Sequence, residues 1–310
     1  MGMFLVISCG IRSFDRRLLI LLAGQIAACS SGGEPVTVAG QVQDPGIREA
    51  SGLAASGLDP GRLWVLNDGG SSASVHAIGR DGRPLGVLAI DGAENHDWED
   101  LAAFETGGRA WLLIADVGDN AATRAHVTLY VVPEPASLSG SVGATPTATI
   151  SLRFPDGPRD VEAVAVDADE RQVYLLTKRT LPPELYVLPL VLEGGRDAVT
   201  AEYLGPVTGL PGPSARDVRR APQTGDWYWQ PTAMDFSADA ARAVVLTYEA
   251  VYVFERGPGE NWRDALNGKP ARKHLGGIRE AEGAAIAGDT IFVTVEAAHP
   301  PLYRIEFPRD

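Results

Sequence analysis

The sequence predicts an all-β protein built as a β-propeller, and three observations support this fold class. Short β-rich runs such as RLWVLND, VTLYVV and QVYLLTK are separated by Gly, Pro, Asp and Asn between residues 45 and 307. One motif recurs at the start of five successive segments. The last segment has only three strand-like runs, while an isolated one precedes the first segment. Many short strands are typical of sandwiches, barrels and propellers, and the repeat favours the propeller.

The repeated motif is clearest at the two ends of the domain. Residues 47–54 read IREASGLA and residues 278–285 read IREAEGAA, which are identical at six of eight positions. The sequences HDWEDLA (96–102), RDVEAVA (159–165) and WQPTAMD (229–235) fall in the same register. The copies start at 49, 97, 160, 230 and 280, so the intervals are 48, 63, 70 and 50 residues. Intervals near 50 fit one four-stranded blade, and the two longer ones indicate insertions.

The strand-like stretch VTVAGQV (36–42) precedes the first copy, and the last copy ends at Phe307 with three strands. We expect residues 36–42 to add the missing outer strand of the last blade and so close the ring, which hides the sheet edges. The prediction is one propeller domain over 36–310 with five blades. Residues 191–230 leave room for a degenerate sixth blade.

The N-terminus has the order of an export signal. Three arginines precede LLILLAGQIAA (18–28), an apolar run too short to span a bilayer stably. The sequence IAAC (26–29) then resembles a bacterial lipobox, and a Ser- and Gly-rich stretch follows. We therefore expect a signal peptide over 1–28, lipidation of Cys29 and a tether over 29–35. The protein would be exported and anchored to a membrane through its lipid; an uncleaved anchor or a plain signal peptide are the alternatives.

Charge and cysteine content exclude several classes of function. The net charge of −13 argues against binding a nucleic-acid backbone and suits the attraction of cations. Cys9 and Cys29 are the only cysteines, so a disulfide framework, a thiol nucleophile and a cysteine zinc site are not expected in the mature chain. The five histidines are scattered without zinc-ligand spacing. We expect a monomer.

The repeat places charged residues in rings around one mouth of the channel, because the first strand of each propeller blade lines that channel. The first ring is Glu49, Asp97, Asp160, Gln230 and Glu280. Side chains two residues apart share a strand face, so a second ring follows: Ser51, Glu99, Glu162, Thr232 and Glu282. The ends of the second strands form a third: Asp68, Asp116, Lys178, Tyr248 and Glu296. The mouth is therefore expected to be acidic.

Two interpretations of this acidic mouth stay open. Four of the first-ring positions follow a basic residue (Arg48, His96, Arg159 or Arg279), so ion pairs could fix the ring without any ligand. Alternatively, the mouth binds calcium, which takes six to eight oxygen ligands. The first two rings contain seven acids, more than the four basic neighbours can neutralise. The loop DVGDN (116–120) adds further oxygens, and the loop NDGG (67–70) does the same in the preceding blade. The candidate metal ligands are Glu49, Asp97, Glu99, Asp116, Asp119, Asp160, Glu162 and Glu282.

Residues with other chemistry are fewer. His96 and Glu99 are the candidates for proton transfer, since a histidine titrates near neutral pH. Lys178 and Arg124 could bind an anionic group of a substrate, although a salt bridge from Lys178 to Glu162 or Glu184 is the alternative. The insertion over 209–231 contains WYW (227–229), which could stack on a sugar, anchor a partner or plug the mouth. No G-x-S-x-G, Walker or G-x-G-x-x-G motif is present.

The acid-rich D-x-E-x-hydrophobic-A pattern at the blade starts, with IADVGDN following HDWEDLA, resembles exported bacterial propellers of the phytase-like or esterase-like group, which are calcium-dependent and of a six-bladed type. In β-propeller phytases, acids at the channel mouth bind several calcium ions that hold and polarise a phosphate ester. The comparable positions are Asp97, Glu99, Asp116, Asp119, Asp160, Glu162 and Glu282. Related lactonase-type propellers hold one metal with Glu, Asn and Asp, which Glu49, Asn67, Asp116 and Glu282 match.

This sequence also departs from the phytase pattern. It lacks a Lys- and Arg-rich phosphate clamp, and its fourth blade has Gln230 and Thr232 in place of acids. The resemblance implies a calcium-binding propeller whose substrate is a small anionic or ester compound, either a phosphoester or a lactone. The alternative is a non-enzymatic surface or periplasmic propeller that binds a protein or glycan partner.

Overall fold

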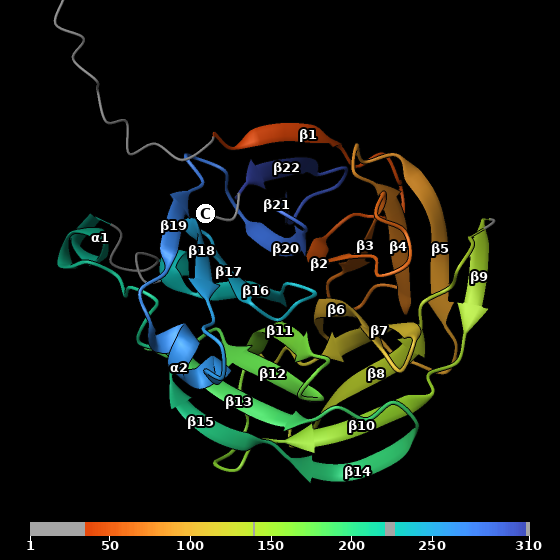
Figure 1. Ribbon diagram of the computed structural model, residues 1–310, viewed down its shortest axis with the longest axis horizontal. Coiled ribbons are helices and arrows are strands. Elements are labelled where there is room, and N and C mark those ends of the chain that lie inside the picture. The colour runs from red at the N-terminus through yellow and green to blue at the C-terminus, as the bar shows by residue number, and fades with distance from the viewer. Residues whose placement is uncertain (1–34, 139, 221–226, 308–310) are drawn as a thin grey trace, which may run out of the picture. The chain divides into compact units, whose positions relative to one another are not determined.

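Five β-sheets are arranged around a central channel in the computed structural model, which describes residues 35–138, 140–220 and 227–307 (Figure 1). The predicted signal peptide (1–28) and the tether up to residue 34 lie outside the described residues. Among the residues that are described, no helix is long and apolar enough to cross a membrane. The all-β propeller prediction is confirmed.

Each of the first four blades is an antiparallel meander of four strands, numbered from the channel outward. The first blade consists of β2 (Ala50–Ala55), β3 (Arg62–Asn67), β4 (Ser74–Gly79) and β5 (Pro84–Ile90). The second consists of β6 (Trp98–Thr106), β7 (Arg109–Asp116), β8 (Val127–Pro133) and β10 (Ala148–Arg153). The third consists of β11 (Val161–Asp167), β12 (Gln172–Thr177), β13 (Glu184–Pro189) and β15 (Glu202–Pro206). The fourth consists of β16 (Pro231–Phe236), β17 (Arg242–Thr247), β18 (Ala250–Glu255) and β19 (Ala271–His274).

The fifth blade joins the two ends of the domain. Its inner strands are β20 (Ala281–Ala287), β21 (Thr290–Val295) and β22 (Pro301–Glu306), and β1 (Thr37–Gln41) is its outer strand. Strand β1 pairs antiparallel with β22, with Thr37 opposite Arg304 and Gln41 opposite Pro301. The predicted closure of the ring by residues 36–42 is therefore confirmed.

The two long intervals between repeats contain strands that reach back to the preceding blade. Strand β9 (Ser141–Ala144) pairs parallel with β5 of the first blade, and β14 (Gly194–Thr200) pairs parallel with β10 of the second. Each insertion thus covers an exposed outer edge, which would otherwise present unpaired backbone groups. Within the described part of 191–230 the chain forms β14, β15, the short helix α1 (Ala215–Arg220) and the 3-10 helix η1 (Trp227–Trp229). The sixth-blade alternative is wrong, and the propeller has five blades.

The core lies between adjacent sheets, so the middle strands of the blades are buried on both faces. All six residues of β3 and of β17 are buried, and Trp64, Trp98 and Trp262 are among the largest fully buried side chains. Trp262 belongs to the second short helix, α2 (Trp262–Asn267), and stacks on Phe236 with ring centroids 3.8 Å apart. Burial of this kind explains the nearly continuous apolar runs in the sequence.

The inner strand of every blade carries an irregularity at the same place. The pairing register with the second strand shifts between Ala50 and Leu53, and again at the matching step of the other four blades: Trp98 to Asp100, Val161 to Ala163, Pro231 to Ala233, and Ala281 to Gly283. The second-ring residues are the ones that the shift skips. A β-bulge leaves its extra residue unpaired and re-aims its side chain, so the bulges position this ring.

A fully buried aspartate crosses the channel just below the mouth. The Asp100 carboxylate accepts hydrogen bonds from the backbone N–H groups of Val164 (2.9 Å) and Met234 (3.3 Å). These donors belong to β11 and β16, so one side chain connects the inner strands of three blades. Burial raises the pKa of Asp100 well above its usual value. This contact therefore ties three of the five inner strands together.

Candidate functional site

A small cavity of about 160 Å³ lies at the mouth where the inner strands begin. Four of its lining residues belong to the predicted second ring: Ser51, Glu99, Glu162 and Glu282. Four more belong to the third ring: Asp68, Lys178, Tyr248 and Glu296. Asn120, from the loop after β7, completes the lining. The two rings therefore converge as the repeat predicts, and Thr232 is turned aside because its hydroxyl donates to the Ala281 carbonyl oxygen at 2.7 Å.

Three carboxylates from the three rings meet at one side of this cavity. Oxygens of Asp68, Asp97 and Glu99 all lie within 4.8 Å of one another. The backbone N–H of Asp97 donates to the buried Asp116 carboxylate at 3.2 Å, which fixes the start of β6. Asp68 follows β3 in the neighbouring blade. The sequence predicts it as a third-ring residue and, within the loop at residues 67–70, as a source of oxygen ligands, although it is not among the eight candidate ligands.

Two glycines make room for these carboxylates. A Cβ atom on Gly118 would lie 2.2 Å from Glu99 Oε1 and 2.5 Å from Asp97 Oδ2. A Cβ atom on Gly69 would lie 2.6 Å from Asp97 Oδ1. Neither glycine is in the left-handed backbone region, so space and not conformation requires glycine at these positions. The Asp97 and Glu99 carboxylates therefore rest directly against backbone, in a cradle formed by Gly69 and Gly118.

Burial and mutual repulsion raise the pKa values of the carboxyl groups in the mouth. Burial and then the charge of Asp68 raise the pKa of Asp97 to about 6. Burial also raises the pKa of Glu99 well above its usual value, and the charge of Glu162 raises it further. For Glu162 and Glu282, burial raises the pKa to about 7 and about 8, although Lys178 opposes the rise in both. Burial and mutual repulsion thus favour the protonated form of these carboxyl groups, and the cations of the site oppose this only in part.

Lys178 is the cation inside the cavity. Its Nζ atom lies 2.7 Å from Glu162 Oε2 and 3.8 Å from Glu282 Oε1, and it stands 5.4 Å from the centre of the Tyr248 ring. The Tyr248 hydroxyl donates to Glu282 Oε1. Glu282 Oε2 is buried and has no hydrogen-bond partner among the described residues. One acceptor oxygen of a side chain that is only 5 % exposed is therefore unsatisfied in the cavity.

Several predicted ligands instead hold the loops around the cavity. Asp116 pairs with Arg124 at 2.7 Å, so this arginine is occupied and does not line the cavity. Asp119 accepts hydrogen bonds from the backbone N–H groups of Thr123 and Arg124. Asp160 pairs with Arg179 at 2.6 Å and accepts from the Asp119 N–H. Glu49 is exposed at the rim, where its carbonyl oxygen accepts from Asp68.

The basic residues that precede the first ring do not neutralise it as the ion-pair interpretation expects. His96 has a 62 % exposed side chain that pairs with Glu94 at 2.9 Å, and it does not line the cavity. Arg159 pairs with Glu184 and Asp156 and not with Asp160. Successive side chains of an extended chain point to opposite faces, so a base directly before an acid faces away from it. The cations that pair with ring acids are Lys178, Arg179 and Arg124.

The aromatic insertion lies beside the mouth and not inside it. Trp227 and Tyr228 are 49 % and 48 % exposed, and Arg272 stacks on the Trp229 ring at 5.0 Å. Trp229 also lines a separate apolar groove of about 330 Å³ with residues 181–183 and 210–213. No residue of the WYW stretch lines the acidic cavity, so it does not plug the mouth.

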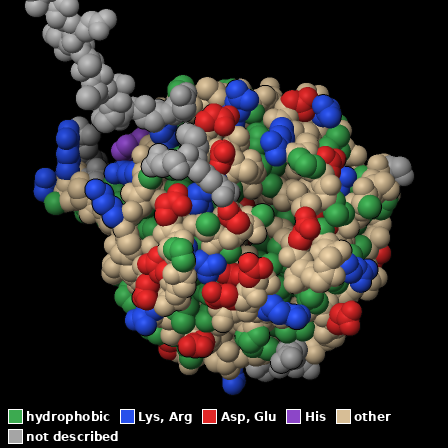
Figure 2. All heavy atoms as spheres, viewed as in Figure 1, with side chains coloured by type: hydrophobic (Ala, Val, Ile, Leu, Met, Phe, Trp, Pro, Cys, Tyr) green, Lys and Arg blue, Asp and Glu red, His purple; other side chains and the backbone are tan. Residues whose placement is uncertain are grey.

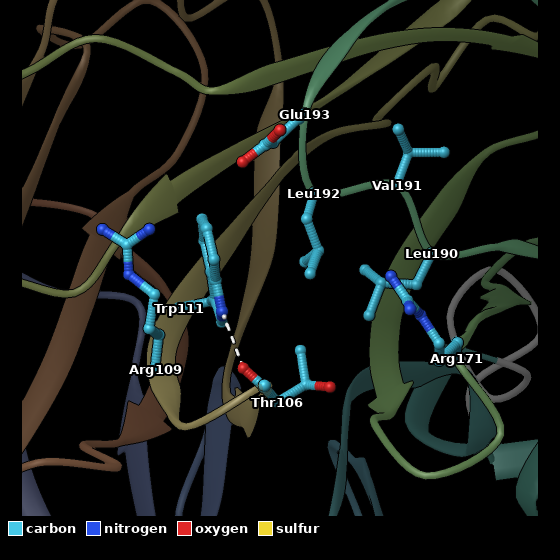
Figure 3. A pocket seen from close by; sticks show the side chains of 9 residues that line it. Thr106, Arg109, Trp111, Arg171, Leu190, Val191, Leu192 and Glu193 are labelled. Carbon is cyan, nitrogen blue, oxygen red and sulfur yellow. Dashed lines mark hydrogen bonds between the residues drawn. The ribbon is translucent and has the colours of Figure 1, made fainter.

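A larger cavity of about 440 Å³ lies between the second and third blades (Figure 3). Its wall contains Trp111, whose indole N–H donates to the Thr106 carbonyl oxygen at 3.4 Å, with Arg109, Arg171 and Glu193 around it. Trp111 is only 3 % exposed and belongs to the core. None of the ring residues lines this cavity, so the candidate site is the channel mouth.

Comparisons with known proteins add little to this geometry. No family model matches the chain, and no curated protein matches it. Among solved structures, a chain from "Crystal structure of Nidogen/Laminin Complex" is similar, with a TM-score of 0.41 and 10 % sequence identity. The likeness covers 80 % of this chain and 72 % of that chain. At this level it carries no conclusion about function, and the five-bladed propeller rests on the strand pairing described above.

Proposed function

We propose that the channel mouth binds a divalent cation, with calcium favoured, and that the loaded mouth hydrolyses a small phosphoester or lactone. The observation that carries this proposal is the convergence of Asp68, Asp97 and Glu99 within 4.8 Å on the two-glycine cradle. Calcium prefers carboxylate and carbonyl oxygens and tolerates irregular geometry, and water completes its shell. The cavity of about 160 Å³ has room for an ion and a few waters.

The residues present fit such a cation. The donor set consists of oxygens, whereas zinc prefers His and Cys ligands. The unsatisfied Oε2 of Glu282 supports the proposal, as do the pKa values of Asp97 and Glu99, which burial and neighbouring carboxylates raise. A bound cation would supply that charge, and it would lower the pKa values of its ligands.

The other residues of the cavity can perform the remaining chemistry. When bound, the cation polarises the ester and activates water as a Lewis acid. Glu162 and Glu282, with pKa values near 7 and 8, can take and return a proton at neutral pH. Lys178 lies between them and can orient an anionic or carbonyl oxygen. This role for Glu162 replaces the one first assigned to His96, because His96 faces solvent.

An ester screen tests the hydrolytic proposal. Turnover of p-nitrophenyl phosphate, a phosphodiester and a γ-lactone is measured with excess calcium and with excess chelator. We expect calcium-dependent turnover that Glu162→Gln lowers by about 100-fold or more, the usual range for loss of a general acid or base. The matched control is Glu255→Gln, an exposed glutamate at the end of β18, which should retain activity. Calcium binding without turnover of any ester would refute hydrolysis.

A second candidate function is non-enzymatic binding of a protein or glycan partner at the same face. The exposed rings of Trp227 and Tyr228 favour it, since aromatic side chains often anchor partners and stack on sugars. On this account calcium raises the melting temperature but supports no turnover. Trp227→Ala would then weaken binding in a glycan array or to a purified partner, while calcium affinity stays unchanged.

We also propose that the protein is exported and held at a membrane by lipid on Cys29. The support is the order of basic residues, short apolar run and IAAC sequence at the N-terminus, which lies outside the described residues. An acyl anchor contributes about 0.8 kcal/mol per buried CH₂ group, so more than one chain gives stable attachment.

A further inference from the structure

We propose that the end of the channel opposite the acidic mouth binds a small molecule with an apolar body and one carboxylate, which Arg80 recognises. This proposal is independent of the cation site. It rests on a second cavity at the other ends of the inner strands and on an arginine that has no ion pair with any described carboxylate.

The second cavity has a volume of about 420 Å³, within the range of small-molecule sites. All five blades contribute to it, because β2, β6, β11, β16 and β20 all end there. Its apolar lining includes Phe104, Val166, Phe236 and Ile286, and small residues such as Ala103 and Ala287 leave the space between them. It shares no lining residue with the cavity at the acidic mouth.

Figure 2 shows this end of the propeller, the face on which α2 lies in Figure 1. Acidic and basic side chains are interspersed around its centre. The three most buried arginines near this end all have carboxylate partners. Arg62 pairs with Glu134 at 3.4 Å, Arg242 pairs with Asp289 at 3.0 Å, and Arg256 pairs with Asp167 at 3.0 Å. The ordinary role of a buried arginine here is thus to hold structure by ion pairing.

Arg80 does not follow this rule. It follows β4, lines the cavity, and stands 5.4 Å from the centre of the Phe292 ring. Its Nε atom is buried and makes no hydrogen bond with any described residue, which is also true of Arg62 and Arg242. Unlike those two arginines, Arg80 has no ion pair with a described carboxylate. A guanidinium group offers five donors in a fixed fork that fits a carboxylate. A buried donor without a partner costs free energy, and a ligand carboxylate would satisfy it.

The other charged groups of the cavity restrict the ligand to one negative charge. Glu105 and Asp169 are exposed at its edge and would repel a phosphate dianion. Asp235 is buried, and its carboxylate accepts the Ile286 N–H at 2.8 Å, so it is occupied. The remaining lining is apolar or neutral. A short fatty acid or an aromatic monocarboxylate matches both the charge and the volume.

Isothermal titration with hexanoate, hexanol and hexylamine tests this site. Hexanoate should bind the full-length protein saturably, and Arg80→Gln should weaken it at least about tenfold while leaving hexanol unchanged. The matched control is Arg83→Gln, since Arg83 lies on the same turn, is 63 % exposed and pairs with Asp81 at 3.2 Å. A chelator should have no effect, which distinguishes this site from the cation site.

A space-filling variant provides the second arm. Ala103→Phe should abolish binding of both hexanoate and hexanol, because it occupies the cavity without touching the charge of Arg80. Thermal melting checks that each variant is folded; if Ala103→Phe does not fold, Ala287→Leu replaces it. Equal hexanoate affinity in wild type and Arg80→Gln, or no saturable binding up to about 10 mM, would overturn the proposal.

Discussion

Replacing Gly118 with alanine should disable the cation site while leaving the propeller folded. The added Cβ would lie 2.2 Å from Glu99 Oε1 and 2.5 Å from Asp97 Oδ2, whereas Cβ contacts shorter than 3.0 Å essentially never occur in proteins. The Glu99 oxygen must therefore move by about 0.8 Å. Metal–oxygen distances are defined to within about 0.2 Å, so this displacement removes at least one ligand from its position.

The expected loss of calcium affinity in Gly118→Ala is tenfold or more, which corresponds to about 1.4 kcal/mol. The expected loss of stability is about 1–3 kcal/mol, as for other overpacked sites. Calcium titration calorimetry measures the first, and urea unfolding in the presence of a chelator measures the second. Gly212→Ala is the matched control, because a Cβ there meets no atom within 4 Å and the backbone is not left-handed. Wild-type calcium affinity in Gly118→Ala would refute the cradle as the basis of the site.

Three further predictions concern the fold, its pH dependence and its location. Deleting residues 30–41, which removes β1 (Thr37–Gln41), should abolish cooperative thermal unfolding, because β22 loses its outer partner; a variant that melts like the wild type would contradict ring closure. Burial raises the pKa of Asp235 from 3.8 to about 7, so the folded protein retains a proton that the unfolded chain releases, and stability falls as the pH rises through that window. Asp235→Asn should remove this dependence of stability on pH. Measured by urea unfolding, the free energy of unfolding of the variant relative to the wild type should therefore rise by a few kcal/mol from pH 4 to pH 8. An equal difference at both pH values would contradict the assignment. Cys29→Ser should move the protein from the membrane to the soluble fraction, and unchanged retention would favour an uncleaved anchor.

The blade number and the ring closure could be predicted because their signals are local in the sequence. The motif occurs once at each inner strand, so the number of its copies gives the number of blades. The last repeat has only three strands, so its sheet needs a fourth strand from the other end of the chain. The pairing of β9 and β14 with the outer strands of the preceding blades was not predicted. It depends on where each insertion meets the sheet edge of that blade in space. Four-residue strands such as SVGA carry too weak a pattern to indicate such a partner.

The site was predicted in part. Period-two alternation correctly grouped Glu99, Glu162 and Glu282, although the bulges that aim them into the channel were not foreseen. The loop that contains Asp68 was predicted to supply oxygen ligands, but its meeting with Asp97 and Glu99 was not, because only the packing of the first two blades brings them together. The expectation that each first-ring acid forms an ion pair with the base directly before it was wrong. Neighbouring side chains of an extended chain point to opposite faces, so such a base and acid do not meet.

The most direct test of the cation site is calcium titration calorimetry on the wild-type protein after exhaustive chelation. The geometry of Asp68, Asp97 and Glu99 predicts saturable binding of at least one ion per chain with a dissociation constant of about 1 mM or lower, abolished by Asp97→Asn. The absence of saturable calcium binding at millimolar concentration would contradict this account. The repulsion among the carboxyl groups of the acidic mouth would then be relieved only by their protonation and by ion pairs with lysine and arginine.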